Sequence, residues 1–318
     1  MEHMKIAVVI PCYNVAEHIG RAVGSVLAQT HRDLDIVAVD DGSTDGTAEE
    51  LDRYVQQGLL RCIRQDRKGA SAARNVGMLG TEGEYIQFLD ADDELAPDKI
   101  GRQVELIRAA KDPALIIGDY IDRMEDGTTT EKRCGTDDPW MALIKGRLGT
   151  TSADLWQRAS VLSVGAWDPT LASSQDHELA FRVMRAQGKV VFDGRADTTI
   201  LKRNKGSISK GDPIGNWERY IALRVSIREH MRTTDATAYA EHIATVDQLI
   251  FGAVRIVSKS DPAGGYALFE KHLPTGFVPR AEGATSAAYL RLYKWMGFST
   301  AERAIGALDN LQRMFGKG

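Results

Sequence analysis

Short apolar runs alternate with segments of helical periodicity through the first 120 residues. The runs lie at Ile6–Ile10, Leu34–Val39, Leu60–Ile63, Tyr85–Leu89 and Ala114–Tyr120. An almost wholly apolar, β-branched run is typical of a strand buried on both faces, as in a parallel sheet. Between the runs, apolar residues recur three and four positions apart, which predicts amphipathic helices. This alternation predicts a doubly wound α/β sheet with ligands at the carboxyl ends of its strands.

The pattern changes at about residue 213. From there on, apolar residues such as Ile243, Val246 and Ile250 repeat at helical intervals, and few strand signals remain. We therefore expect two domains, an α/β domain at 1–212 and a mainly helical domain at 213–318. The second would contact an acceptor, a dimer partner or a membrane. Its helices are expected to be interrupted by a loop at Asp261–Gly265, where proline and glycine break the pattern.

Composition narrows the class of protein. The 318 residues are 43% hydrophobic, enough for one substantial core and a smaller domain. The net charge of -4 gives no reason to expect a nucleic-acid partner. Three widely spaced cysteines without a C-x-x-C pair predict free thiols in a reducing compartment. Neither a membrane span nor a signal-peptide pattern is present, so we expect a cytoplasmic protein, with peripheral contact at the inner membrane face as an alternative.

Two acidic loops follow apolar runs. Asp40 to Gly46 can offer acceptors to a base or ribose, or can be a polar turn that caps the next helix. In the second loop, Asp90 and Asp92 are two positions apart on an extended backbone and can face one side. Such carboxylates repel one another unless a cation neutralises them, and Mn²⁺ or Mg²⁺ suits carboxylate oxygens. A solvated loop with Asp93 as a helix cap is the alternative, but delivery to the sheet edge favours a metal site.

A third candidate segment is rich in small residues. The segment Lys68–Gly77 predicts a helix that approaches the sheet or a ligand closely. On it, Arg74 and Asn75 supply donors for a phosphate or a sugar hydroxyl. The alternative is a tightly packed helix with an exposed arginine. No G-x-G-x-x-G or G-x-x-x-x-G-K-[ST] string occurs, which disfavours a dehydrogenase or a P-loop enzyme.

Taken in order, the motifs resemble those of the family 2 glycosyltransferases of the GT-A fold. They are Val9-Ile-Pro-Cys-Tyr-Asn14, Val39-Asp-Asp-Gly-Ser-Thr-Asp45, Gly69-Ala-Ser-Ala-Ala-Arg-Asn75 and Phe88-Leu-Asp-Ala-Asp-Asp93. A fifth segment, Trp167 to Arg182, resembles the stretch that carries the family's catalytic base. The resemblance covers roughly residues 5 to 210. It implies a mostly parallel mixed sheet flanked by helices, followed by a helical C-terminal region.

The resemblance also implies roles for the donor site. Asp41 would contact the base of a nucleotide, and Pro11 with Tyr13 would form the wall of that pocket. Asp92 would coordinate the Mn²⁺ or Mg²⁺ ion on the diphosphate. Asp90 would meet the ribose or support the metal ligands.

Further roles fall on the later segments. Asp176 matches the second acid of the family's Glu-Asp pair and would be the general base, whereas Gln175 replaces the first acid. Arg203, Lys205 and Ser207 lie in a segment that resembles the one closing over the donor phosphates; a solvated cationic face is the alternative for these cations.

The expected activity is transfer of one sugar, with inversion, from a nucleoside diphosphate sugar to an acceptor hydroxyl. The resemblance favours a UDP-sugar as donor, and a glycan or lipid-linked glycan of bacterial surface polysaccharide or glycoconjugate synthesis as acceptor. A homo-oligomer is compatible with this reading. The alternatives are a non-catalytic nucleotide- or sugar-binding module and a sugar-1-phosphate nucleotidylyltransferase. Nucleotidylyltransferases usually open with a glycine-rich, arginine-bearing loop, whereas this chain opens with Ile10-Pro-Cys-Tyr-Asn14.

Overall fold

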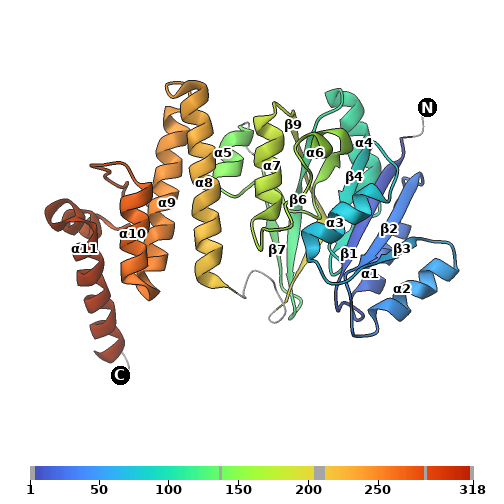
Figure 1. The fold of residues 1–318 in the computed structure, drawn as a ribbon, viewed down its shortest axis with the longest axis horizontal. Helices are drawn as coiled ribbons and strands as arrows, with labels where there is room; N and C mark the ends of the chain where they lie inside the picture. Colours follow the sequence, from blue (N-terminus) through green and yellow to red (C-terminus); the bar gives the residue numbers. More distant parts are fainter. Residues whose placement is uncertain (1–3, 136–137, 204–211, 283–284, 316–318) are drawn as a thin grey trace. The chain divides into compact units, whose positions relative to one another are not determined.

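The structure is a computed structural model that describes residues 4–135, 138–203, 212–282 and 285–315 (Figure 1). The chain divides into two compact units, Met1–Lys210 and Gly211–Gly318. The sequence-based boundary after residue 212 is close to this division, and the roles expected for the two parts remain predictions. Lys205 and Ser207 lie outside the described residues.

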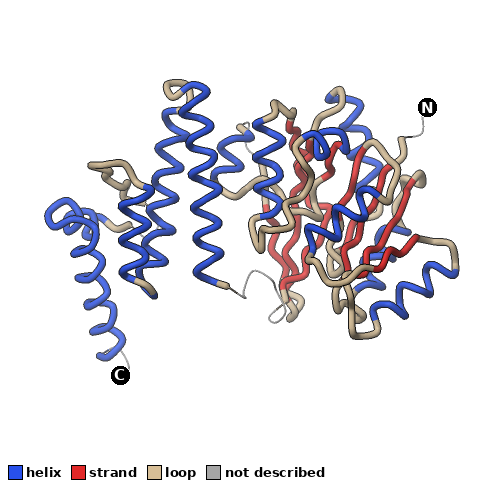
Figure 2. Tube along the Cα trace, viewed as in Figure 1, coloured by secondary structure: helices blue, strands red, loops and turns tan. Residues whose placement is uncertain are grey.

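A mixed sheet forms the centre of the first unit. In the described chain its strands lie in the order β3, β2, β1, β4, β8, β6, β9 and β5, and β7 pairs with β6. Helices flank the sheet, which confirms the expected α/β class (Figure 2). The strands are β1 Ile6–Cys12, β2 Leu34–Asp40, β3 Arg61–Arg64, β4 Tyr85–Phe88, β5 Glu94–Leu95, β6 Leu115–Met124, β7 Thr129–Lys132, β8 Leu155–Gln157 and β9 Val190–Lys202. The helices are α1 Ile19–Leu27, α2 Thr47–Gln56, α3 Ala70–Leu79, α4 Lys99–Ala110, α5 Pro139–Ile144, α6 Arg158–Ser163 and α7 Gln175–Arg185.

The first half of the sheet follows the apolar runs of the sequence. β1 pairs in parallel with β2 and β4, and β2 pairs in parallel with β3. Side chains alternate along a strand, so Ile6, Val8 and Ile10 pack with apolar residues of α1, α2 and α4. Val9 points to the opposite face, where α3 lies. Both faces of β1 are therefore covered, which explains why this strand is almost wholly apolar.

The second half of the sheet contains the antiparallel pairs. β8 pairs antiparallel with β4 and β6, β5 pairs antiparallel with β9, and β9 runs parallel to β6. β8 has three residues and β5 has two, so neither is long enough to give a periodic signal in the sequence. The expected sheet was mostly parallel; these pairs make its second half largely antiparallel. They also bring the end of β9 next to the loop after β4.

Gly77 allows α3 to approach the sheet closely. A Cβ at this position would overlap the side chain of Val9 and lie 3.0 Å from that of Val39. Overpacking of this kind costs about 1–3 kcal/mol. We expect Gly77→Ala to lower the free energy of unfolding by about 2 kcal/mol, measured by urea denaturation with circular dichroism. Gly24→Ala in α1 is the control, because an added carbon there meets no atom within 4 Å; equal losses in both variants would contradict the packing argument.

The second unit consists of helices, as the sequence predicted. They are α8 Pro213–Asp235, α9 Ala240–Ser260, α10 Pro262–His272 and α11 Ala287–Phe315. Phe251 lies at the centre of an aromatic cluster that also contains Phe269, Phe277, Tyr289, Tyr293 and Phe298. A buried ion pair joins Arg228 Nη1 and Asp247 Oδ1 at 2.5 Å. Among the described helices, none has both the length and the apolar character needed to cross a membrane.

The loop expected at Asp261–Gly265 is wrong. α10 begins at Pro262, and the side chain of Asp261 accepts a hydrogen bond from the backbone N–H of Gly264. An aspartate cap followed by proline is a typical helix start, because proline needs no hydrogen-bond partner in the first turn. The residues that suggested a loop therefore end one helix and begin the next.

Candidate active site

The loops that follow β1, β2 and β4 meet at one edge of the sheet. The register places Cys12 beside Asp40, so β1 and β2 end together, and places Phe88, the last residue of β4, beside Val9, three residues before the end of β1. Asp41 directly follows β2, and its backbone N–H donates to the Cys12 carbonyl at 2.8 Å. The segments expected to form the donor site, far apart in the sequence, are therefore adjacent at this edge, as the topology of open α/β sheets requires.

The Asp41 carboxylate organises the loop after β3. It is 3% exposed and accepts hydrogen bonds from Gln65 Nε2 at 2.6 Å and from the backbone N–H groups of Lys68 and Gly69 at 2.8 and 2.7 Å. The same loop carries Arg67, whose guanidinium lies 4.0 Å from the centre of the Tyr13 ring. Asp41 thus has a structural task that the sequence did not indicate. A carboxylate has about four acceptor positions, so one remains for the predicted contact with a base.

Each of the two loop carboxylates contacts an arginine. Arg74 Nη2 lies 2.7 Å from Asp90 Oδ1, and Arg203 Nη2 lies 2.8 Å from Asp92 Oδ2. Burial and the negative charge of Asp90 raise the pKa of Asp92, while Arg203 acts to lower it. Arg203 thus offsets part of the repulsion between the two carboxylates, which a cation would offset further.

The donor set at this loop fits a divalent cation that arrives with a diphosphate. Within the described residues, no group of three or more His, Cys, Asp or Glu side chains is arranged to hold a metal by itself. Mg²⁺ is usually held by one or two carboxylates together with substrate phosphates, and Mn²⁺ accepts the same oxygen ligands. Asp92 and Asp90 supply that number of carboxylates, and a cation would relieve the repulsion that raises the pKa of Asp92.

Asp93, the third acid of the motif, points into the protein. It is 3% exposed, and its carboxylate accepts hydrogen bonds from Ser152 Oγ at 2.6 Å and from the backbone N–H of Leu201 at 3.1 Å. Burial, followed by the charges of Asp90 and Asp92, raises its pKa well above the usual range. The alternative in which Asp93 caps a helix is wrong: α4 has Asp98 at its cap position. Asp93 instead ties the acidic loop to β9.

Arg74 connects the acidic loop with helix α7. Besides Asp90, its guanidinium binds Gln175 Oε1 at 3.0 Å and lies 4.7 Å from the centre of the Trp167 ring. The residue is 5% exposed, so the alternative of an exposed arginine on a packed helix is wrong. One buried cation thus joins the loop expected to hold the donor phosphates to the residue that precedes the expected base. The sequence could not indicate this bridge, because Arg74 and Gln175 are 101 positions apart.

Asn75 holds the segment that contains Trp167. Its amide donates to the Trp167 carbonyl at 2.8 Å and accepts from the Trp167 backbone N–H at 3.0 Å. The second N–H of the Asn75 amide remains for the contact with the donor substrate that the sequence predicts. The pairing also keeps Trp167 against Phe88, with ring centres 5.1 Å apart.

Asp176 lies in the first turn of α7. Its Oδ1 accepts a hydrogen bond from the backbone N–H of His177 at 2.9 Å and lies 3.5 Å from His177 Nδ1. The side chain is 26% exposed, which leaves it within reach of a substrate hydroxyl. The unpaired N–H groups and the dipole at a helix start stabilise a carboxylate there. This environment suits a proton acceptor.

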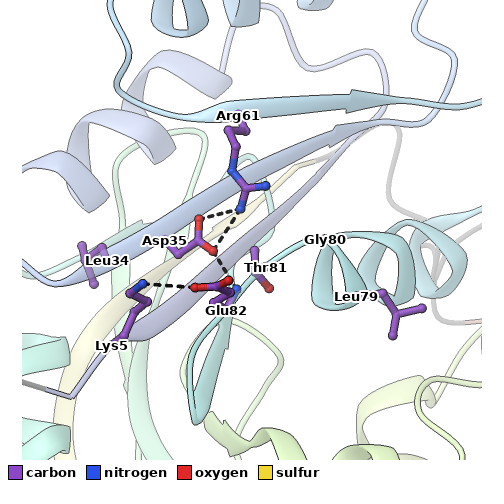
Figure 3. Close-up of a pocket in the computed structure, with 8 residues that line it drawn as sticks. All are labelled: Lys5, Leu34, Asp35, Arg61, Leu79, Gly80, Thr81 and Glu82. Carbon is purple, nitrogen blue, oxygen red and sulfur yellow. Dashed lines mark hydrogen bonds and ion pairs between the residues drawn. The ribbon is translucent and has the colours of Figure 1, made fainter.

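An open cavity of about 500 Å³ lies at the opposite edge of the sheet (Figure 3). It is lined at the amino ends of the parallel strands by Lys5, Leu34, Asp35, Arg61 and residues 79–82. Figure 3 shows its charges paired with one another: Arg61 binds Asp35 at 2.7 Å, and Lys5 binds Glu82 at 3.3 Å. Ligands of such sheets bind at the carboxyl ends of the strands, so this cavity is not the candidate site.

A family model described as Glycosyl transferase family 2 matches residues 7–165, half of the chain. The matched part contains Asp41, Arg74, Asp90 and Asp92, whereas Asp176 and Arg203 lie beyond it. The chain therefore belongs to glycosyl transferase family 2, as its motifs predicted.

Relatives match about a third to two fifths of the chain. An uncharacterized glycosyltransferase of Nostoc is 43% identical over 109 residues, which are 34% of this chain and 34% of that protein. Glycosyltransferase GlyG of Streptococcus pneumoniae is 36% identical over 117 residues, 36% of this chain and 38% of the relative. The putative teichuronic acid biosynthesis glycosyltransferase TuaG of Bacillus subtilis is 33% identical over 129 residues, 40% and 51% of the two chains. The matches thus span a third to a half of these relatives' lengths.

Solved structures share the fold over almost the whole chain. TarS 1–349 of S. aureus in complex with UDP-GlcNAc has a TM-score of 0.60 and 15% identity, over 95% of this chain and 91% of that one. The mannosyltransferase PcManGT of Pyrobaculum calidifontis, in complex with GDP-Man and Mn²⁺, has a TM-score of 0.50 and 17% identity, over 100% and 89%. At these identities the likeness establishes the GT-A fold.

Proposed function

We propose that this glycosyltransferase moves one sugar, with inversion, from a nucleoside diphosphate sugar to an acceptor hydroxyl, and that the donor is a UDP-sugar. The observation that carries the proposal is the Arg74 bridge. It joins Asp90, on the loop suited to a cation and diphosphate, to Gln175, the neighbour of Asp176. A donor-binding loop and a proton acceptor attached to one buried cation form the arrangement that a direct displacement needs.

In the proposed reaction, Asp176 accepts the proton of the acceptor hydroxyl while its oxygen bonds to the anomeric carbon. The bond from that carbon to the diphosphate breaks, and the nucleoside diphosphate leaves with the electron pair. A single displacement assisted by one base inverts the anomeric configuration. A Mn²⁺ or Mg²⁺ ion held by Asp92 and Asp90 would supply positive charge for the leaving diphosphate. Arg203, which pairs with Asp92, would contact the same phosphates.

The acceptor is proposed from the relatives. TuaG is named for teichuronic acid biosynthesis, and TarS was solved with UDP-GlcNAc. We therefore propose a glycan or lipid-linked glycan of bacterial surface polysaccharide or glycoconjugate synthesis as acceptor. The helical unit is the proposed place for its contact, for a dimer partner or for peripheral contact with a membrane.

Calorimetric binding of UDP, dTDP, GDP and CDP, each with and without Mn²⁺, tests the proposal. A carboxylate only accepts hydrogen bonds, so Asp41 would accept one from the ring N–H of uracil, thymine or guanine, whereas cytosine offers only its exocyclic amine, at a different position on the base. Burying a polar group without its partner costs at least about ten-fold in affinity. We expect UDP to bind tightest in the presence of Mn²⁺, and CDP at least about ten-fold more weakly.

The possible outcomes separate the functions. Binding of CDP as tight as that of UDP would contradict a contact between Asp41 and the ring N–H of the base. Binding of UDP without transfer from any UDP-sugar to acceptor or water would favour a non-catalytic binding module. Formation of a nucleotide sugar from a nucleoside triphosphate and a sugar 1-phosphate would favour a nucleotidylyltransferase. Absence of nucleotide binding under all conditions would remove the basis of the proposed donor site.

A further inference from the structure

Ser152 connects the two ends of the acidic loop from inside the protein. It lies in the segment between α5 and β8 and is fully buried. Its Oγ accepts a hydrogen bond from the backbone N–H of Asp90 at 3.0 Å and donates one to Asp93 Oδ2 at 2.6 Å. The loop also closes on itself, since the Asp93 N–H donates to the Asp90 carbonyl at 3.0 Å. One hydroxyl thus holds the residues on either side of Asp92.

Ser152 is itself held by a chain of buried polar groups. Gln87, on β4, donates from Nε2 to the Ser152 carbonyl at 2.8 Å. Lys99, at the start of α4, donates from Nζ to Gln87 Oε1. Gln87 is 0% exposed and Lys99 is 1% exposed. A buried polar network is costly unless its groups are bonded, and when they are it restrains the backbone strongly. These buried hydrogen bonds therefore fix the position of Ser152.

We propose that Ser152 is a positioning residue that holds Asp90 and Asp92 in the orientation required by a cation and a diphosphate. This inference rests on the proposed function of the acidic loop. Removal of the hydroxyl leaves the Asp90 N–H without its acceptor, and leaves the Leu201 N–H as the remaining described hydrogen-bond donor to the Asp93 side chain. The loop then gains freedom, and Mg²⁺ and related hard cations tolerate little deviation in the placement of their ligands.

Hydrogen–deuterium exchange of the full chain tests the restraint without any ligand. In Ser152→Ala, exchange of backbone amides in residues 88–95 is expected to rise at least about ten-fold, as expected when a local restraint is lost. β2 and β3 are expected to change little. Ser71→Ala is the matched control: Ser71 is also buried, and its hydroxyl has no hydrogen-bond partner within the described part of the chain. Unchanged exchange at 88–95, or an equal rise throughout the unit, would overturn the proposal.

Calorimetry of UDP with and without Mn²⁺ tests the consequence. Ser152→Ala is expected to lose about ten-fold of the affinity gained from Mn²⁺ while keeping the affinity measured without it. Ser152→Cys is expected to fall between wild type and Ser152→Ala, because a thiol is a weak donor and acceptor. Equal Mn²⁺-dependent binding by wild type and Ser152→Ala would overturn the positioning role. Failure of wild type to bind would refute the proposed function instead, and the exchange result would still decide whether Ser152 restrains the loop.

Discussion

Replacing Asp176 with asparagine is expected to lower kcat by about 10³-fold and to change the affinity for UDP with Mn²⁺ by less than about three-fold. A positioned general base contributes about 10²- to 10⁴-fold to a rate. Asparagine has the same shape and can keep the hydrogen bond from the His177 N–H, but it cannot accept the proton of the acceptor. Release of UDP from UDP-GlcNAc or another UDP-sugar, with calorimetry in parallel, measures both quantities.

Glu178→Gln is the matched control for this experiment. Glu178 lies on the same helix, two positions after Asp176, and pairs with Arg182 at 2.7 Å. Its loss is expected to change kcat by less than about three-fold, because an ion pair within one helix is worth only a few tenths of a kcal/mol, roughly a factor of two. A small effect of Asp176→Asn on kcat would transfer the base to another group. An equal loss in both variants would point to a structural effect on α7.

Replacing Asp92 with asparagine is expected to remove the dependence of UDP binding on Mn²⁺. Asparagine keeps the volume of the side chain and takes away the charge that a hard cation requires. In the presence of Mn²⁺ we expect the affinity for UDP to fall at least about 30-fold, whereas without Mn²⁺ it stays the same or rises. A rise has a physical basis: Arg203 loses one ionised partner, which lowers the cost of a contact between its guanidinium and a phosphate.

A second aspartate in an ion pair, Asp122, provides the control for Asp92. Asp122 on β6 pairs with Lys202 at 3.0 Å, just as Asp92 pairs with Arg203, the next residue of the chain. Asp122→Asn therefore removes a carboxylate from a similar ion pair outside the acidic loop, and Mn²⁺-dependent binding is expected to remain. Persistence of the Mn²⁺ effect in Asp92→Asn would contradict the assignment of the cation to this loop. Loss of the effect in both variants would indicate a general dependence on negative charge.

Arg74 contacts the neighbours of both residues that these predictions change, Asp176 and Asp92. Its guanidinium binds the charged Asp90 and the neutral Gln175, where the resemblance leads one to expect a glutamate. Because Gln175 carries no charge, Asp90 is the one carboxylate among the described contacts of Arg74. The first turn of α7 is nevertheless held, since the Gln175 amide also donates to the Leu171 carbonyl at 2.6 Å. The amide of Gln175 thus bonds both to Arg74 and to the segment before α7, next to Asp176.

The local pattern of the sequence was sufficient to predict the strands whose carboxyl ends carry the expected donor site. β1, β2 and β4 are mainly apolar because both faces of the sheet are covered, so each gives a clear signal by itself. Parallel strands bring the loops that follow them to one edge, which is why ligands were expected at the carboxyl ends of the strands. The helical C-terminal unit was equally predictable, because helical periodicity extends over many residues.

The tertiary structure decided which residues bind each of the three aspartates at residues 90–93. The sequence does not indicate the partners of Asp90, Asp92 and Asp93, which bind Arg74, Arg203 and Ser152 from three distant segments. The two-residue β5 and the three-residue β8 could not be predicted from the sequence for the same reason. Their pairing depends on neighbouring strands rather than on a periodic pattern of apolar residues. Apolar periodicity is a property of consecutive residues and can be read from them. The partner of a buried charge is chosen by packing, because desolvation makes every such group bond to whatever polar atom the fold brings within reach.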